Sequence, residues 1–71
     1  MKLERLKDLR EDKDLLQKDI AKILNMSQQQ YSRIETGEND IRLDSIIKLS
    51  YFYEVSTDYI LGLTNKKERY K

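Results

Sequence analysis

The segment MSQQQYSRIETG, residues 26–37, contains the clearest helix start and stop signals in the chain. Ser27 is followed three residues later by Gln30, which is the spacing of a capping box at a helix N-terminus. Gly37 can adopt the left-handed conformation that commonly ends a helix. The sequence therefore predicts a short, rigid helix over residues 27–36.

The rest of the chain is also patterned for helices. It contains no proline and only two glycines, and its apolar residues recur at helical spacing. Four further helices are predicted, over about residues 2–12, 17–24 and 43–53 and from Ser56 to Gly62. The predicted fold class is therefore all-α, a compact bundle of five short helices. The candidate core of the fourth helix comprises Leu43, Ile46, Ile47, Leu49 and Phe52.

Composition argues against catalytic and metal chemistry. The chain has 71 residues, enough for one small domain, and it contains no cysteine and no histidine. It thus lacks disulfides, thiolate ligands and the commonest acid–base group near neutral pH. Asp12, Asp14 and Asp19 do not have the spacing of a calcium loop, and a solvated charged turn explains them. We expect no enzyme, no cofactor, no metal site and no small-molecule ligand.

No segment has the character of a membrane span or a signal peptide. No apolar run approaches the roughly 18 to 20 residues that cross a bilayer. The N-terminal sequence MKLERLKDLRED is highly charged and lacks the apolar centre of a signal peptide. We therefore expect a cytoplasmic protein without a membrane partner.

Charge is nearly balanced overall but unevenly distributed. The chain has 14 basic and 13 acidic residues, a net charge of +1, which argues against a non-specific, chromatin-like binder of nucleic acid. Residues 37–65 carry a net charge of −3, whereas the tail at residues 66–71 carries +3. Such segregation lets one surface meet phosphates while another does not. The alternative for the tail is a solvated, frayed terminus.

The helix predicted at residues 27–36 presents an outward face without carboxylates, at about 100° per residue. Amides on such a face can pair with adenine, and arginine can pair with guanine or phosphate, whereas a carboxylate would be repelled by phosphates. The face therefore fits a DNA major groove, and the alternative is an ordinary solvated helix face. Its residues are Gln29, Ser32, Arg33 and Thr36, with Gln28 at the flank.

The segment before that helix completes a helix-turn-helix pattern. Two helices that cross steeply need a small residue where they meet, and Ala21 is placed for it. The tight turn between them needs a residue that tolerates positive φ, and Asn25 is placed there. The alternative, two unrelated amphipathic helices, leaves these two residues unexplained.

With these residues the chain resembles the Cro and phage-repressor helix-turn-helix family, also called the xenobiotic-response-element family. The segments LQKDIAKILNMSQQQYSRIETGE and VSTDYILGL match its pattern in order and spacing, and the similarity covers about residues 6–63. The resemblance implies a lambda-repressor-like DNA-binding domain over residues 1–65, with the motif at about residues 17–36 and a basic tail at 66–71. It also implies sequence-specific binding to double-stranded DNA and a role as a transcriptional regulator, most often a repressor.

The resemblance also implies which residues touch DNA. Base-reading positions fall at the start of the third predicted helix, and phosphate-contacting positions fall at the start of the second helix and in the loop after the third. The candidate residues are Gln28 and Gln29 for bases, Ser32 and Arg33 for bases or backbone, and Gln17 and Asn39 for phosphates. Ser27, at the cap of the third helix, is counted among the DNA-binding residues as well.

Five positions depart from the pattern of the family. Leu16 stands where Ser or Thr usually caps the first motif helix, and Asp14 and Asn25 stand where glycine is frequent. Arg42 stands where proline or serine is frequent, near the start of the fourth predicted helix, and is a candidate for an extra phosphate contact. Glu38 stands where lysine is common, which weakens attraction to the DNA backbone locally. We therefore expect a weak cap at Leu16 and reduced phosphate affinity around Glu38.

The expected partners are duplex DNA and a second copy of the chain. One recognition helix reads few base pairs, so helix-turn-helix proteins generally bind two-fold operators as dimers. The aromatic cluster Tyr51, Phe52, Tyr53 and Tyr59 is either core or dimer interface, with core favoured for Phe52. The rival hypothesis is a protein-binding module on the same fold, such as an antitoxin or an anti-repressor partner, which the near-neutral charge allows.

Overall fold

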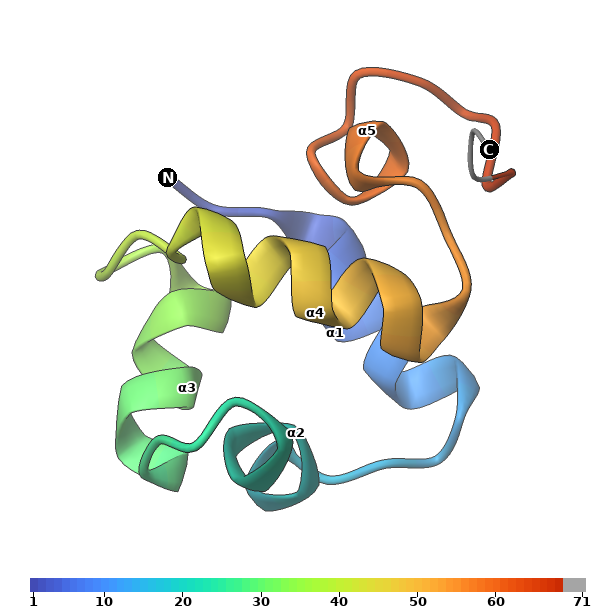
Figure 1. Ribbon diagram of the computed structural model, residues 1–71. Helices are drawn as coiled ribbons and strands as arrows, with labels where there is room; N and C mark the ends of the chain where they lie inside the picture. The colour runs from blue at the N-terminus through green and yellow to red at the C-terminus, as the bar shows by residue number, and fades with distance from the viewer. Residues whose placement is uncertain (69–71) are drawn as a thin grey trace.

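The computed structural model describes residues 1–68, and this part of the chain contains five helices and no strand. The all-α prediction is confirmed, and each helix lies at the expected place in the chain. The helices are α1 (Glu4–Asp12), α2 (Gln17–Ile23), α3 (Gln28–Thr36), α4 (Leu43–Tyr53) and α5 (Thr57–Ile60), coloured from blue to orange in Figure 1.

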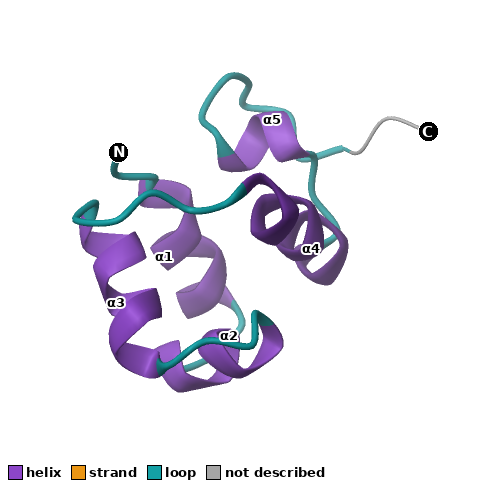
Figure 2. Ribbon diagram, turned by 60° about the vertical axis from the view of Figure 1, so that its left-hand side comes forward, coloured by secondary structure: helices purple, strands orange, loops and turns teal. Residues whose placement is uncertain are grey.

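Every helix contributes one fully buried side chain to a single core. In Figure 2, α1 and α3 lie side by side with α2 across one end of the pair, and α4 and α5 form the other side of the molecule. The side chains that meet between them exclude water almost completely, which is the main stabilising contribution available to so small a fold. They are Leu6, Ile20, Tyr31, Leu49 and Ile60.

The predicted core face of α4 is partly wrong. Ile46 and Leu49 are buried, as expected, but Leu43, Ile47 and Phe52 are exposed. The inward face of α4 instead includes Tyr53, with two buried serines beside the apolar residues. Because α4 is apolar around most of its circumference, the helical period alone does not identify the face that packs inward.

Left-handed residues set the turns between the helices. Asn25 has φ of 56°, which confirms the predicted turn between α2 and α3, and Gly37 ends α3 with φ of 87°. A side chain at Gly37 would also meet the N-terminal segment, because its Cβ would lie 2.9 Å from the Cβ of Lys2. Asp14 and Glu54 adopt positive φ as well, at 56° and 57°.

The helix starts differ in how they are capped. At α3 the Ser27 hydroxyl accepts from the Gln30 backbone N–H at 3.1 Å, and the Gln30 side chain accepts from the Ser27 N–H at 2.9 Å, so the predicted capping box is confirmed. At α2 the side chain of Leu16 cannot accept a hydrogen bond. The Asp19 carboxylate accepts from the Leu16 N–H at 2.8 Å, which supplies half of a capping box.

The segment after α5 folds back over that helix. Arg5 of α1 donates to the backbone carbonyls of Tyr59 and Thr64 and to the Asn65 side chain, and its guanidinium lies 4.0 Å from the centre of the Tyr59 ring. The Ser56 N–H donates to the Lys67 carbonyl at 2.8 Å. The first part of the predicted basic tail therefore lies against α5, and residues 69–71 lie outside the described residues.

None of the helices in residues 1–68 has the length and apolar character that crossing a membrane requires.

Candidate nucleic-acid interface

Burial of one side of α3 determines which side faces solvent. Tyr31, Ile34 and Glu35 are buried against the rest of the fold. The opposite side carries side chains that are exposed, or half-buried in the case of Ser32, and none of them is acidic. They are Gln28, Gln29, Ser32, Arg33 and Thr36, as the helical period predicts.

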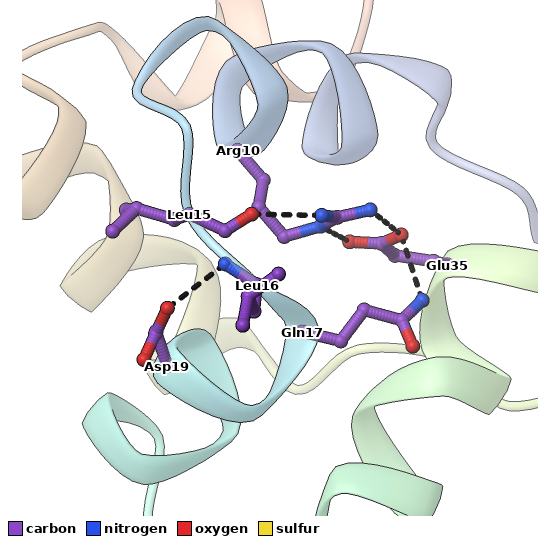
Figure 3. Close-up of polar contacts among 6 residues, drawn as sticks. All are labelled: Arg10, Leu15, Leu16, Gln17, Asp19 and Glu35. Atoms are coloured by element: carbon purple, nitrogen blue, oxygen red, sulfur yellow. Dashed lines mark hydrogen bonds and ion pairs between the residues drawn. The ribbon is translucent and has the colours of Figure 1, made fainter.

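Glu35 of α3 is a buried member of an ion pair. Its carboxylate accepts from Arg10 of α1, at 2.8 Å from Nε and 3.2 Å from a terminal nitrogen, a two-pronged geometry drawn in Figure 3. Only 5% of the Glu35 side chain and 12% of the Arg10 side chain are exposed. The pair fixes the rotation of α3 relative to α1, because both groups lose their partner if α3 turns.

The ion pair keeps Glu35 charged. Burial acts to raise the pKa of Glu35, but hydrogen bonds from Arg10 and Gln17, together with the Arg10 charge, outweigh it and lower that pKa below its ordinary value. The hydrogen bond to Glu35 likewise raises the pKa of Arg10 against the effect of burial. At neutral pH the inward side of α3 therefore carries a charged ion pair beside its apolar residues, whereas Arg33 is the one charged residue on the outward side.

Gln17, a predicted phosphate contact, has an internal partner. Its amide nitrogen donates to a Glu35 carboxylate oxygen at 3.1 Å, while its amide oxygen points away from that carboxylate (Figure 3). The side chain is half-buried. A phosphate contact by this amide would have to use its second hydrogen or replace the bond to Glu35.

The two predicted arginines each lie beside an acidic neighbour. Nε of Arg33 is 3.9 Å from a Glu38 carboxylate oxygen, and Nε of Arg42 is 3.5 Å from Asp44. All four side chains are at least half exposed, so these ion pairs are weak and screened by salt. Both guanidinium groups can exchange the carboxylate for a phosphate without a change of backbone.

The loop that follows α3 lies beside that helix. Asn39 is exposed, and its N–H donates to the Arg33 carbonyl at 3.1 Å. Asn39 and Arg42 line a hollow of about 390 Å³ with residues of α3. The predicted loop residues therefore lie beside α3, next to Gln30 and Ile34, whereas Ser27 and Gln30 are engaged in the capping box.

Two basic residues on α2 belong to the same surface and were missed in the sequence. Lys18 and Lys22 are exposed and line a hollow of about 450 Å³ with Ser27, Gln28 and Gln30 at the start of α3. Their spacing of four residues on the predicted second helix is the signal that could have identified them.

Residues 1–68 contain no group of three or more acidic or other ligating side chains arranged for a metal ion.

Comparison with known proteins gives a consistent result. Residues 6–60 match the helix-turn-helix family. The chain is 41% identical over 58 residues to the HTH-type transcriptional regulator ImmR of Bacillus subtilis, a match that covers 82% of the chain and 46% of the relative. It is 34% identical over 65 residues to the uncharacterized HTH-type transcriptional regulator YobD of the same organism, covering 92% of the chain and 58% of the relative. The chain thus spans about half the length of these relatives, and no solved structure matches it significantly.

Proposed function

The chain belongs to the helix-turn-helix family, and on that premise we propose that it is a sequence-specific double-stranded DNA-binding regulator of transcription, acting as a repressor in the cytoplasm. Both relatives described above carry the name of transcriptional regulators. A bound domain without catalytic groups regulates most simply by occupying a promoter. The proposal therefore assigns it repression by occlusion of the promoter.

The observation that carries the proposal is the outer face of α3, which is exposed and carries no acidic residue. Gln28 and Gln29 are exposed at the start of the helix, where a recognition helix meets base edges in the major groove. A glutamine amide can accept from N6 and donate to N7 of adenine, a pairing that no other base offers. The buried Arg10–Glu35 pair supports this role, because it fixes the rotation of α3 that presents these amides.

Contacts to the DNA backbone are assigned to the edges of that face. Exposed cations and amides lie around α3: Arg33 on the helix itself, Asn39 and Arg42 in the segment after it, and Lys18 and Lys22 on α2. Gln17 joins them through the second hydrogen of its amide. Contacts of such groups with phosphates fix the register and orientation of a groove-bound helix on the duplex.

Homodimerisation follows from the small size of the reading surface. A single α3 contacts only a few base pairs, and helix-turn-helix proteins extend their sites by pairing across two half-sites one helical turn apart. We therefore assign the chain an operator with inverted half-sites and a homodimer at least on DNA.

The second candidate function is a protein-binding module, such as an antitoxin or an anti-repressor partner. It is favoured by the net charge of −3 over residues 37–65 and by exposed apolar residues on α4. Titration of binding to a random duplex with salt separates the two functions. A DNA-binding protein loses affinity steeply as salt rises, whereas an adaptor for proteins does not bind the duplex at any salt concentration.

Selection of bound sites from a random DNA pool then tests sequence specificity. The proposed function predicts enrichment of one sequence arranged as inverted repeats. A pool that stays random after repeated selection would contradict a sequence-specific regulator.

A further inference from the structure

The start of α3 differs from the other helix starts in residues 1–68. Each of the other four helices has an acidic residue in its first turn, and α3 has none. An acidic residue there stabilises a helix, because it faces the positive end of the helix dipole. The first turn of α3 relies instead on a complete capping box between two uncharged side chains. The four acidic residues of the other helices are Glu4, Asp19, Asp44 and Asp58.

The capping box encloses the two residues that are proposed to read bases. The Ser27 hydroxyl accepts from the Gln30 backbone N–H at 3.1 Å, and the Gln30 side chain accepts from the Ser27 N–H at 2.9 Å. Gln28 and Gln29 lie between these two residues and are the first two residues of α3. The two hydrogen bonds therefore hold the segment of backbone that carries both exposed amides.

We propose that the Ser27–Gln30 capping box sets the sequence selectivity of the chain, because it positions the two enclosed amides against the base edges. The inference rests on the proposed function, in which these amides read bases, and it adds the residues on which the reading depends. A glutamine amide recognises adenine through two hydrogen bonds made at once, which requires a fixed orientation of the side chain. A first turn that frays loses this alignment.

The absence of charge in the box suits a helix that enters DNA. A carboxylate in the first turn of α3 would stabilise the helix in the free chain, but in the major groove it would lie among phosphates and be repelled. Ser27 and Gln30 satisfy the backbone groups of the first turn without that repulsion, because neither side chain is charged. The start of α3 thus combines a fixed first turn with compatibility with a polyanion.

Binding to random DNA should depend little on the box. The proposed phosphate contacts involve side chains outside the first turn of α3, such as Lys18, Arg33 and Arg42. These contacts carry no sequence information, and the affinity for random DNA comes from their charge. The ratio of the affinities for selected and random duplexes is therefore the quantity that the box should control.

Substitutions within the box change this ratio in opposite ways. Ser27→Ala and Gln30→Ala each remove one hydrogen bond of the box. Each should lower the affinity ratio about two- to fivefold, because the aligned first turn is then only partly populated. Gln30→Glu keeps the acceptor of the box and adds a negative charge. It should weaken binding to both duplexes alike and keep the wild-type ratio.

Ser56→Ala is the matched control for Ser27→Ala. The Ser56 hydroxyl caps α5 by accepting from the Tyr59 N–H at 3.0 Å, so the same substitution removes the same kind of cap away from α3 (Figure 2). Both substitutions should lower the melting temperature, because each removes a stabilising cap. Only Ser27→Ala should lower the affinity ratio. All affinities are measured well below the lowest melting temperature, so that every variant is folded.

Nuclear magnetic resonance relaxation tests the positioning without DNA. The backbone N–H order parameters of Gln28 and Gln29 should be about 0.85 in the wild-type chain, the value of a rigid backbone. They should fall in Ser27→Ala and Gln30→Ala and keep the wild-type value in Gln30→Glu and Ser56→Ala. Equal order parameters in the wild-type chain and in both box variants to alanine would contradict positioning by the box.

Three results with DNA would overturn the inference. One is an affinity ratio that is unchanged in Ser27→Ala or in Gln30→Ala. The second is an equal loss of the ratio in Ser56→Ala, which would attribute the effect to overall stability. The third is a loss in Gln30→Glu as large as in Gln30→Ala, which would mean that the Gln30 amide itself contacts a base. A wild-type chain with equal affinity for every duplex contradicts the proposed function instead, and the relaxation measurement then still tests whether the box fixes the first turn.

Discussion

The guanidinium of Arg10 lies 2.8 Å from the carboxylate of Glu35 and joins α1 to α3 inside the fold. Arg10 also donates to the Leu15 carbonyl at 2.9 Å, and Gln17 donates to Glu35 at 3.1 Å, so the segment that leads into α2 is connected to the same pair (Figure 3). One polar cluster thus connects α1, the start of α2 and α3, which are the elements that orient the recognition face.

Removing one member of this pair should be strongly destabilising. Arg10→Met or Glu35→Gln leaves a buried charge without its partner, which costs about 3 to 5 kcal/mol of unfolding free energy. The double variant Arg10→Met/Glu35→Leu removes both charges and should recover at least half of that loss. Urea unfolding measures all three variants. A double variant as unstable as the sum of the two single variants would mean that the groups do not act as a pair.

The stability of the fold should decrease in acid because of Glu35. Its pKa is lowered in the folded chain, so the carboxylate contributes stability that is fully present above its ordinary pKa of 4.5 and is lost as pH falls through the folded value. The difference in unfolding free energy between the wild-type chain and Glu35→Gln should therefore be constant at neutral pH and shrink below about pH 4.5. A difference that stays constant down to pH 2 would show that the charge of Glu35 does not stabilise the fold.

Gly37 should tolerate a side chain less well than Gly62. Both have positive φ, 87° and 79°, so replacement by alanine strains the backbone at both positions by roughly 1 to 2 kcal/mol. Only at Gly37 does the new Cβ also meet another residue, at 2.9 Å from the Lys2 Cβ. Thermal unfolding should show a larger decrease in melting temperature for Gly37→Ala than for Gly62→Ala. Equal decreases would mean that the N-terminal segment moves away from the new side chain without loss of stability.

Neutralising Glu38 should strengthen DNA binding without changing its specificity. Glu38→Gln removes a negative charge next to the recognition face and releases Arg33, whose Nε is 3.9 Å from it. We expect affinity to rise roughly three- to tenfold on selected and random duplexes alike, and more at low salt than at high salt. Glu54→Gln is the matched control, because it removes the same charge at the end of α4 that is distant from α3 (Figure 1). A gain confined to the selected sequence would indicate instead that Glu38 takes part in base reading.

Signals between neighbouring residues in the sequence predicted the start and end of α3 correctly. The burial of Glu35 was not predicted, because it depends on packing between distant parts of the chain. The cap at Ser27, the turn at Asn25 and the end at Gly37 are properties of neighbouring residues, so the sequence contains them directly. The burial of Glu35 depends on Arg10, which is 25 residues away, and no local pattern reports it.

The local sequence likewise did not predict which face of α4 is buried. Leu43 and Ile47 are as apolar as the buried Ile46 and Leu49, and only the position of α4 against the other helices distinguishes them. The assignment of Gln28, Gln29 and the flanking residues to DNA contacts came from the family resemblance together with the absence of acidic residues on the outer face of α3. Those contacts stay a prediction until binding is measured.

The central claim is that the outer face of α3 reads DNA sequence, and the affinity of Gln29→Ala for two duplexes tests it most directly. On the sequence selected from a random pool, loss of the amide should cost about 1 to 3 kcal/mol of binding free energy, whereas binding to random DNA should change much less. Arg42→Ala, at a proposed phosphate contact, serves as the comparison and should weaken both duplexes alike. An equal loss on both duplexes for Gln29→Ala would contradict sequence reading by this face.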